Sequence, residues 1–161
     1  MRRKVILAGA LAAFAAGVVA LQVDAQVHQH GKAAASGQAD TRQLVKFPEA
    51  MRLHTITSMR DHLLALQEIN VALSKSDFDE AAKVAERRLG MSSLEQHGAA
   101  HLAPFMPIPM QDIGTQMHRS ASRFAVEAQS ASVSNDVRPA LAALGTVMQQ
   151  CVACHSAYRL H

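Results

Sequence analysis

Aromatic residues are scarce in this sequence: they make up 4% of its 161 residues, and tryptophan is absent. Glycine and proline are also few, with eight and five residues, whereas hydrophobic residues reach 49%. A chain of this length and composition has room for one domain with a real core. The shortage of helix-breaking residues favours an all-α fold, and a large flat cofactor would fill part of a core so poor in rings.

Basic and acidic side chains are nearly balanced, so the net charge is only +3. Three of the cations, Arg2, Arg3 and Lys4, lie in residues 1–25 together with one anion, Asp24. Removing them from the totals of 16 basic and 13 acidic side chains leaves 13 and 12, a net charge of +1. This balance gives no reason to expect nucleic acid or an anionic membrane as a partner.

The first 25 residues have the three parts of an export signal. The cations come first, residues 5–21 are apolar, and the small residue Ala25 ends the segment. We predict a signal peptide over residues 1–25 that is cleaved after Ala25, with Ala20 as the second choice. An uncleaved anchor is the alternative, because the apolar run approaches the ~18 residues that a membrane span needs. Cleavage predicts an exported chain without stable membrane insertion.

Only two cysteines occur, Cys151 and Cys154, and His155 follows them directly. The resulting C-x-x-C-H is the attachment motif of c-type haem. Two thiols at this spacing add across the two vinyl groups of one haem, and the adjacent histidine becomes the proximal ligand of the iron. The motif therefore predicts one covalent haem c, held by Cys151 and Cys154 and ligated by His155. Both cysteines would be consumed, which excludes a disulfide.

Two other uses of such a motif fit the sequence less well. A zinc site needs two more ligands at paired spacing, and no third cysteine exists. A thioredoxin-like dithiol needs a βαβ setting, which the sequence does not indicate.

Residues 26–46 read as a flexible linker, because glycine, serine and glutamine alternate with alanine there without a sustained helical stripe. His28 and His30 form an H-x-H that either binds copper or zinc weakly or lies in a solvated tail. The domain itself is predicted to cover residues 47–161.

Four stretches have apolar residues at steps of three and four, the period of amphipathic helices. They cover about residues 48–74, 77–89, 111–130 and 136–158. Asp77 and Glu80 form a predicted capping box at the second. Four such helices predict an antiparallel four-helix bundle. The predicted inward residues are Ile56, Met59, Leu63, Leu66 and Leu73; Phe78, Ala82, Ala85 and Leu89; Ile113, Met117, Ala121, Phe124 and Ala128; and Val137, Leu141, Leu144, Met148, Cys151, His155 and Tyr158.

Residues 91–110 interrupt the helical pattern, because three prolines rule out continuous helix through APFMPIP. A short helix before them would put His97 and His101 one turn apart, where they could chelate a metal. Met106 and Met110 add soft sulfurs for a copper site. The alternative is that the methionines pack and the histidines are exposed.

The ending from Cys151 to Arg159 resembles the C-x-x-C-H-x-x-[FY]-R ending of the class II cytochromes c, the cytochrome c′ family. The resemblance extends in outline over residues 48–161. It implies a periplasmic four-helix bundle with its haem near the C-terminus, and it allows a homodimer. It also implies that Arg159 packs near the proximal imidazole, although a surface arginine at a helix end is an equal interpretation. Met59 matches the distal position of the family.

The sixth ligand of the iron decides between two functions. If Met59 binds, the haem is low-spin with a raised potential, and the protein transfers single electrons to and from redox partner proteins. If that position is open, the haem is high-spin and binds nitric oxide or carbon monoxide. Met51, His54 and His62 are rival ligands. We do not expect an enzyme, since no nucleophile–base arrangement or acid pair stands out near the motif.

Overall fold

Four long helices form most of the domain in this computed structural model, which describes residues 39–161. The predicted signal peptide, His28 and His30 lie outside the described residues. Each helix matches one of the four amphipathic stretches, with ends that differ by a few residues. The helices are α1 Glu49–Ser74, α2 Phe78–Arg88, α4 Ile108–Ser134 and α5 Arg138–Ala157.

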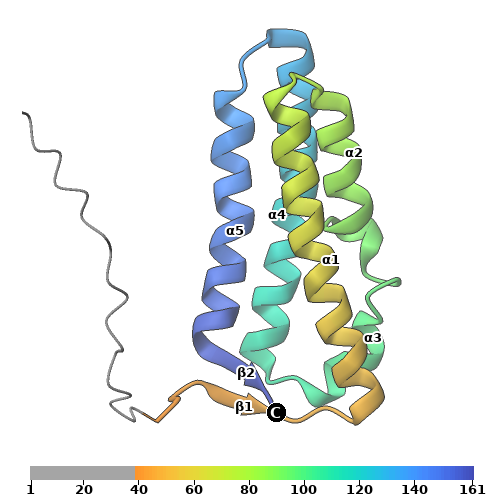
Figure 1. Cartoon of the computed structure of the whole chain (residues 1–161), viewed down its shortest axis with the longest axis vertical. Helices are drawn as coiled ribbons and strands as arrows, with labels where there is room; N and C mark the ends of the chain where they lie inside the picture. The colour runs from red at the N-terminus through yellow and green to blue at the C-terminus, as the bar shows by residue number, and fades with distance from the viewer. Residues whose placement is uncertain (1–38) are drawn as a thin grey trace, which may run out of the picture. The chain divides into compact units, whose positions relative to one another are not determined.

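The long helices pack in chain order: α1 lies against α2, α2 against α4, and α4 against α5. Figure 1 shows them side by side, with the small strands β1 and β2 below them. The fold is thus mostly helical, as the composition predicts. No helix in the described part of the chain is long and apolar enough to cross a membrane.

The start of α2 shows one half of the predicted capping box, since the backbone N–H of Asp77 donates to the Ala72 carbonyl and not to Glu80. The side chain of Asp77 accepts a hydrogen bond from the backbone N–H of Glu80 at 3.2 Å. Asp79 and Glu80 lie in the first turn and Arg87 and Arg88 in the last, so both ends complement the helix dipole.

Residues 91–107 contain only short helical pieces. They are the 3₁₀ turns η1 Met91–Ser93 and η2 Ala103–Phe105 and the single turn α3 Ala99–Leu102. Gly98 precedes α3 with φ +62°, a left-handed conformation that separates His97 from the helix. The predicted helix carrying both His97 and His101 is therefore wrong.

A small parallel sheet joins the two ends of the described domain. Strand β1, Gln43–Val45, pairs with β2, Tyr158–Leu160. Val45 is only 3% exposed, so the ordered domain begins inside the segment that the sequence assigned to a linker. Tyr158, expected at the end of a helical seam, is instead the first residue of β2.

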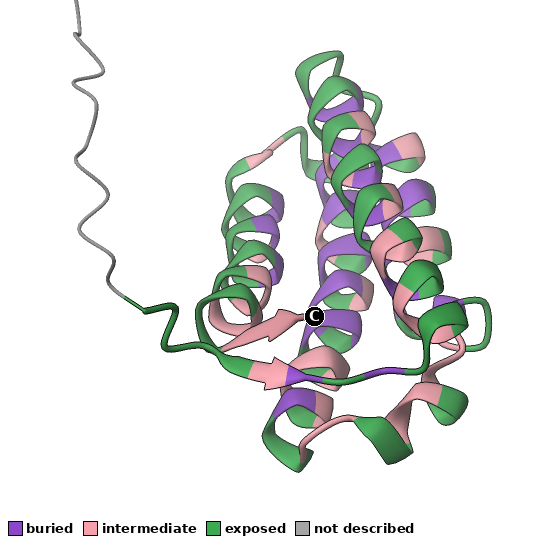
Figure 2. Cartoon of the chain, turned by 60° about the horizontal axis from the view of Figure 1, so that its bottom comes forward, coloured by how far each residue is buried: buried purple, intermediate pink, exposed green. Residues whose placement is uncertain are grey.

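The core is rich in alanine and contains the large side chains Phe124 and Ile69. The faces predicted for α2 and for most of α4 are buried. On α1 and α5 only Leu73 and Leu144 of the predicted inward residues are fully buried. Figure 2 colours the buried residues along the helices purple. On α1 the buried residues are Thr55, His62, Ala65, Ile69, Ala72 and Leu73, and on α5 they are Ala140, Leu144 and Val147.

On both helices, residues that were predicted to face the core are exposed. Met59 and Leu63 on α1 are 39% and 70% exposed, and Leu141 and Met148 on α5 are 48% and 47% exposed. Buried positions on both helices lie one residue before predicted ones: Thr55, His62, Ala65 and Ala72 on α1, and Ala140 and Val147 on α5. Small alanines allow close contact between helices. The prediction chose larger apolar residues on these two helices and left the alanines out.

Candidate functional site

A cavity of about 590 Å³ lies within the helical domain, below the main core. Its wall is built from α1, the segment 94–106, the first half of α4, the end of α5 and strand β2. Cavities of this size, about 300–1,000 Å³, are typical of cofactor sites. Four of the predicted site residues line it together: Cys154, His155, Arg159 and Met59.

The C-x-x-C-H motif occupies the last two turns of α5. Cys151 is half-buried against the main core, and its thiol lies 3.6 Å from the carbonyl of Val147. Cys154 is half-buried against a second cluster formed by Val45, Phe47 and Met110. His155 is exposed and lies on the cavity wall.

Both cysteines are free thiols in the structure. Burial is the main reason why the pKa of Cys151 and of Cys154 lies above its usual range. The two groups are therefore protonated thiols at neutral pH. Neutral thiols are poor nucleophiles for thiol–disulfide exchange.

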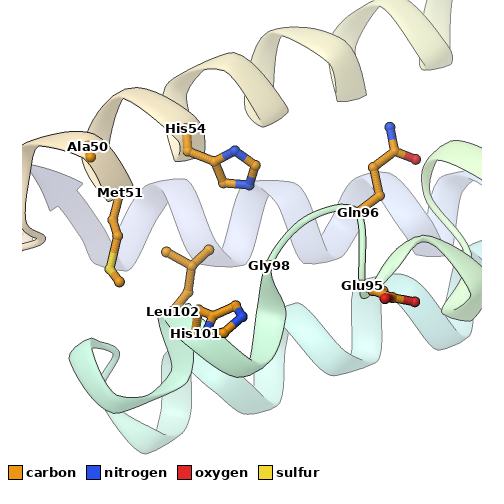
Figure 3. Close-up of a pocket in the computed structure, with 8 residues that line it drawn as sticks. All are labelled: Ala50, Met51, His54, Glu95, Gln96, Gly98, His101 and Leu102. Carbon is orange, nitrogen blue, oxygen red and sulfur yellow. The ribbon is translucent and has the colours of Figure 1, made fainter.

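The four candidates for a distal ligand fall into two groups. Met59 and His62 line the same cavity as His155. Met51 and His54 instead line a smaller cavity of about 370 Å³. Figure 3 shows them on α1 across from His101, which belongs to the short helix α3. Neither Met51 nor His54 lines the larger cavity, although Met51 packs against the same cluster as Cys154.

Helix α1 presents an apolar strip to the larger cavity. Ile56, Met59 and Leu63 line it, one helical turn apart from each other. They form the seam predicted from the sequence, although this seam lies on the cavity instead of a neighbouring helix. Across the cavity, α4 contributes Gly114, where an added Cβ would meet no atom within 4 Å.

Arg159 lies in β2 and lines the cavity. Its Nε is buried and makes no hydrogen bond within the described part of the chain. This nitrogen forms a long ion pair with Asp40, whose Oδ2 lies 3.5 Å away. A buried guanidinium nitrogen without a hydrogen bond is costly, so this position suits a carboxylate of a bound group.

Sequence reasoning missed a cluster of three buried histidines, His62, His97 and His118. They come from α1, from the turn before α3 and from α4, and all three line the cavity. The Nε2 atoms of His62 and His97 lie 3.3 Å apart. No local spacing could have revealed the cluster, because the three residues are 35 and 21 positions apart along the chain.

Burial is the first cause that lowers the pKa of each of these histidines, to about 4 for His62. Mutual repulsion adds to the effect, since His97 and His118 both lower the pKa of His62. The nearby Asp61 acts in the opposite direction, but it also forms an ion pair with Arg88. The cluster is therefore neutral at pH 7.

The predicted pair His97 and His101 is not brought together. His97 is buried in the histidine cluster, whereas His101 is exposed on the smaller cavity. Met106 and Met110 both line the larger cavity. Within residues 39–161, no three histidine, cysteine, aspartate or glutamate side chains are already placed to hold a metal ion.

The larger cavity fits the haem that the motif predicts. Its wall holds one thiol of the motif, Cys154, next to His155, together with several methionines and the buried Nε of Arg159, which makes no hydrogen bond. The other thiol, Cys151, does not line the cavity and packs against the main core. These features are the chemical requirements of a large apolar ring with anionic side groups and an iron centre.

Comparison with known proteins gives no family model, no curated protein and no solved structure that matches this chain. Assignment of a function therefore depends on the residues and the geometry described above.

Proposed function

We propose that this chain is an exported c-type cytochrome that transfers single electrons. Its helices α1, α2, α4 and α5 would form an antiparallel four-helix bundle of the class II type around one haem. The observation that best supports this proposal is that Cys154 and His155 of the C-x-x-C-H motif line a cavity of about 590 Å³ in the helical domain. An export signal in residues 1–25 agrees with maturation in the periplasm.

The residues of this chain have separate tasks in the proposal. Cys151 and Cys154 would hold the haem through two thioether bonds, each formed by adding a thiol S–H across one vinyl double bond, with no leaving group. His155, near the end of α5, would ligate the iron. The haem supplies one-electron chemistry, with a potential set by its ligands and surroundings. Arg159 would pair with a haem carboxylate, which would give its buried Nε a hydrogen bond in addition to the long ion pair with Asp40.

Met59 is the proposed sixth ligand, because it lies on the wall of the cavity that the motif also lines. A thioether favours the reduced iron and raises the potential, which suits a carrier between redox partner proteins. His62 is the rival from the same helix. If neither residue binds, the position is open, and the protein is a high-spin haem protein for nitric oxide or carbon monoxide.

The first experiment tests attachment. The haem of the exported full chain should remain with the polypeptide through acid–acetone extraction and denaturing electrophoresis. Cys151→Ala and Cys154→Ala should each leave at most one thioether bond, detected by mass spectrometry. Complete extraction of haem from the unaltered chain would refute the proposal.

The second experiment tests the sixth ligand by visible and near-infrared spectroscopy. Met59→Ala should convert a low-spin haem to high-spin, lower its potential and accelerate carbon monoxide binding. Met91→Ala is the matched control, because Met91 is 38% exposed against 39% for Met59 and does not line the cavity. An unchanged low-spin spectrum in Met59→Ala would transfer the role to His62. A high-spin spectrum in the unaltered chain would favour gas binding.

A further inference from the structure

The three buried histidines are not used by the proposed haem attachment. His62, His97 and His118 are 7–8% exposed, and each comes from a different segment. Their ring centroids are separated by 4.6, 5.4 and 6.3 Å. Histidine is the commonest metal ligand in proteins, and three neutral imidazoles this close form a set of donors.

Hydrogen bonds orient two of the rings. His118 Nδ1 lies 2.8 Å from the Leu89 carbonyl, so this nitrogen donates and Nε2 keeps a free lone pair. The Ser93 hydroxyl donates to the Gly90 carbonyl at 2.7 Å. Its oxygen can therefore accept from His97 Nδ1, 3.4 Å away, which frees Nε2 of His97. Donation from the second ring nitrogen to a backbone carbonyl is typical of histidines that bind metals.

The spacing of the rings agrees with a shared ion. At a metal–nitrogen bond of ~2.1 Å, two tetrahedral ligands have nitrogens about 3.4 Å apart and ring centroids about 5 Å apart. The Nε2 atoms of His62 and His97 are 3.3 Å apart, which is long for a hydrogen bond between them. The His62–His118 separation of 6.3 Å is about 1 Å too wide. Metal binding therefore requires His118 to move closer.

We propose that His62, His97 and His118 bind one late first-row transition-metal ion, of which Zn²⁺ is the probe. Imidazole nitrogen suits such ions, and a fourth position would open to the cavity, as in zinc sites with three protein ligands. This proposal does not depend on haem attachment.

The test uses the full chain as purified, with His28→Gln and His30→Gln to remove the other candidate chelating pair. Equilibrium dialysis against Zn²⁺ with elemental analysis should give one zinc per chain. Zinc-edge X-ray absorption should show three imidazole ligands. His118→Gln should lower the affinity at least about tenfold, since even outer-shell changes cost 10–100-fold. His101→Gln is the control and should bind as before.

Two measurements keep the test decisive. If His118→Gln loses its far-UV circular dichroism, Ser93→Ala is used, and a lower zinc affinity in the folded variant supports the site. Absence of bound zinc, fewer than three imidazoles, or equal loss in His101→Gln would overturn the proposal. A near-infrared spectrum that assigns His62 to the iron would also overturn it, while leaving the cytochrome function intact.

Discussion

Acid should destabilise the protein through its buried histidines, and His62 allows the effect to be isolated. Burial, followed by repulsion from His97 and His118, lowers the pKa of His62 from 6.5 to about 4. Asp61 opposes this shift and Arg88 adds to it. His62 is 8% exposed, so solvent screens these effects only weakly.

The sign follows from proton uptake. Between pH 6.5 and 4, the unfolded chain binds a proton at His62 and the folded chain does not, so the free energy of unfolding rises with pH. The contribution is complete above pH 6.5 and is lost as the pH falls to about 4. A pKa difference of about 2.5 corresponds to about 3 kcal/mol.

The assay is urea unfolding followed by far-UV circular dichroism, since the chain has no tryptophan. It is run from pH 7 to 4 with a chelator for free metal ions. His62→Leu should lose about 3 kcal/mol less stability over this range than the unaltered chain. Exposed His101→Leu is the control. Carboxylates titrate in all three proteins, so parallel curves for His62→Leu and the unaltered chain would refute the argument.

Three further changes test the fold and the cavity. Asp77→Ala removes the cap on Glu80 and should cost about 1 kcal/mol in urea unfolding; no loss would contradict the capping role. Phe124→Ala, at a fully buried site, should cost about 3–5 kcal/mol, whereas Phe105→Ala at a 41% exposed site should cost much less. Gly114→Leu should keep the fold by circular dichroism but reduce the fraction of chain that carries haem, measured by absorbance at fixed protein concentration. Full haem loading would show that the cavity wall at α4 is not part of the haem site.

Helical periodicity predicted the number and approximate ends of the long helices, because each carries apolar residues at steps of three and four. The cap at Asp77 was readable for the same reason: it depends on residues three apart. The strands β1 and β2 were not, because three residues are too few to show an alternating pattern. Gly98 shows the other limit, since one left-handed residue removed His97 from a helix that spacing alone allows.

The candidate site also contains one feature that depends on neighbouring residues in the sequence and one that depends on residues far apart. Cys151, Cys154 and His155 lie within five residues, so the sequence alone predicts them as haem-binding residues without knowledge of the fold. The histidine cluster joins three segments that are distant in the chain, and only the packing of α1 and α4 around the 94–98 turn brings it together. A motif reports chemistry held in one segment, whereas a cluster of this kind depends on tertiary structure.

The predicted apolar residues of α1 do share one side of the helix, but this side faces the cavity and not a neighbouring helix. The sequence predicted that Ile56, Met59 and Leu63 face the core, and a period of 3.6 can only say that they share one side of a helix. Neighbouring helices instead contact the strip that includes Ala65 and Ile69, because small side chains allow the closest approach. The first strip lies on the cavity wall. An apolar strip with a thioether at its centre suits a haem better than solvent, and Met59 therefore stays the proposed sixth ligand.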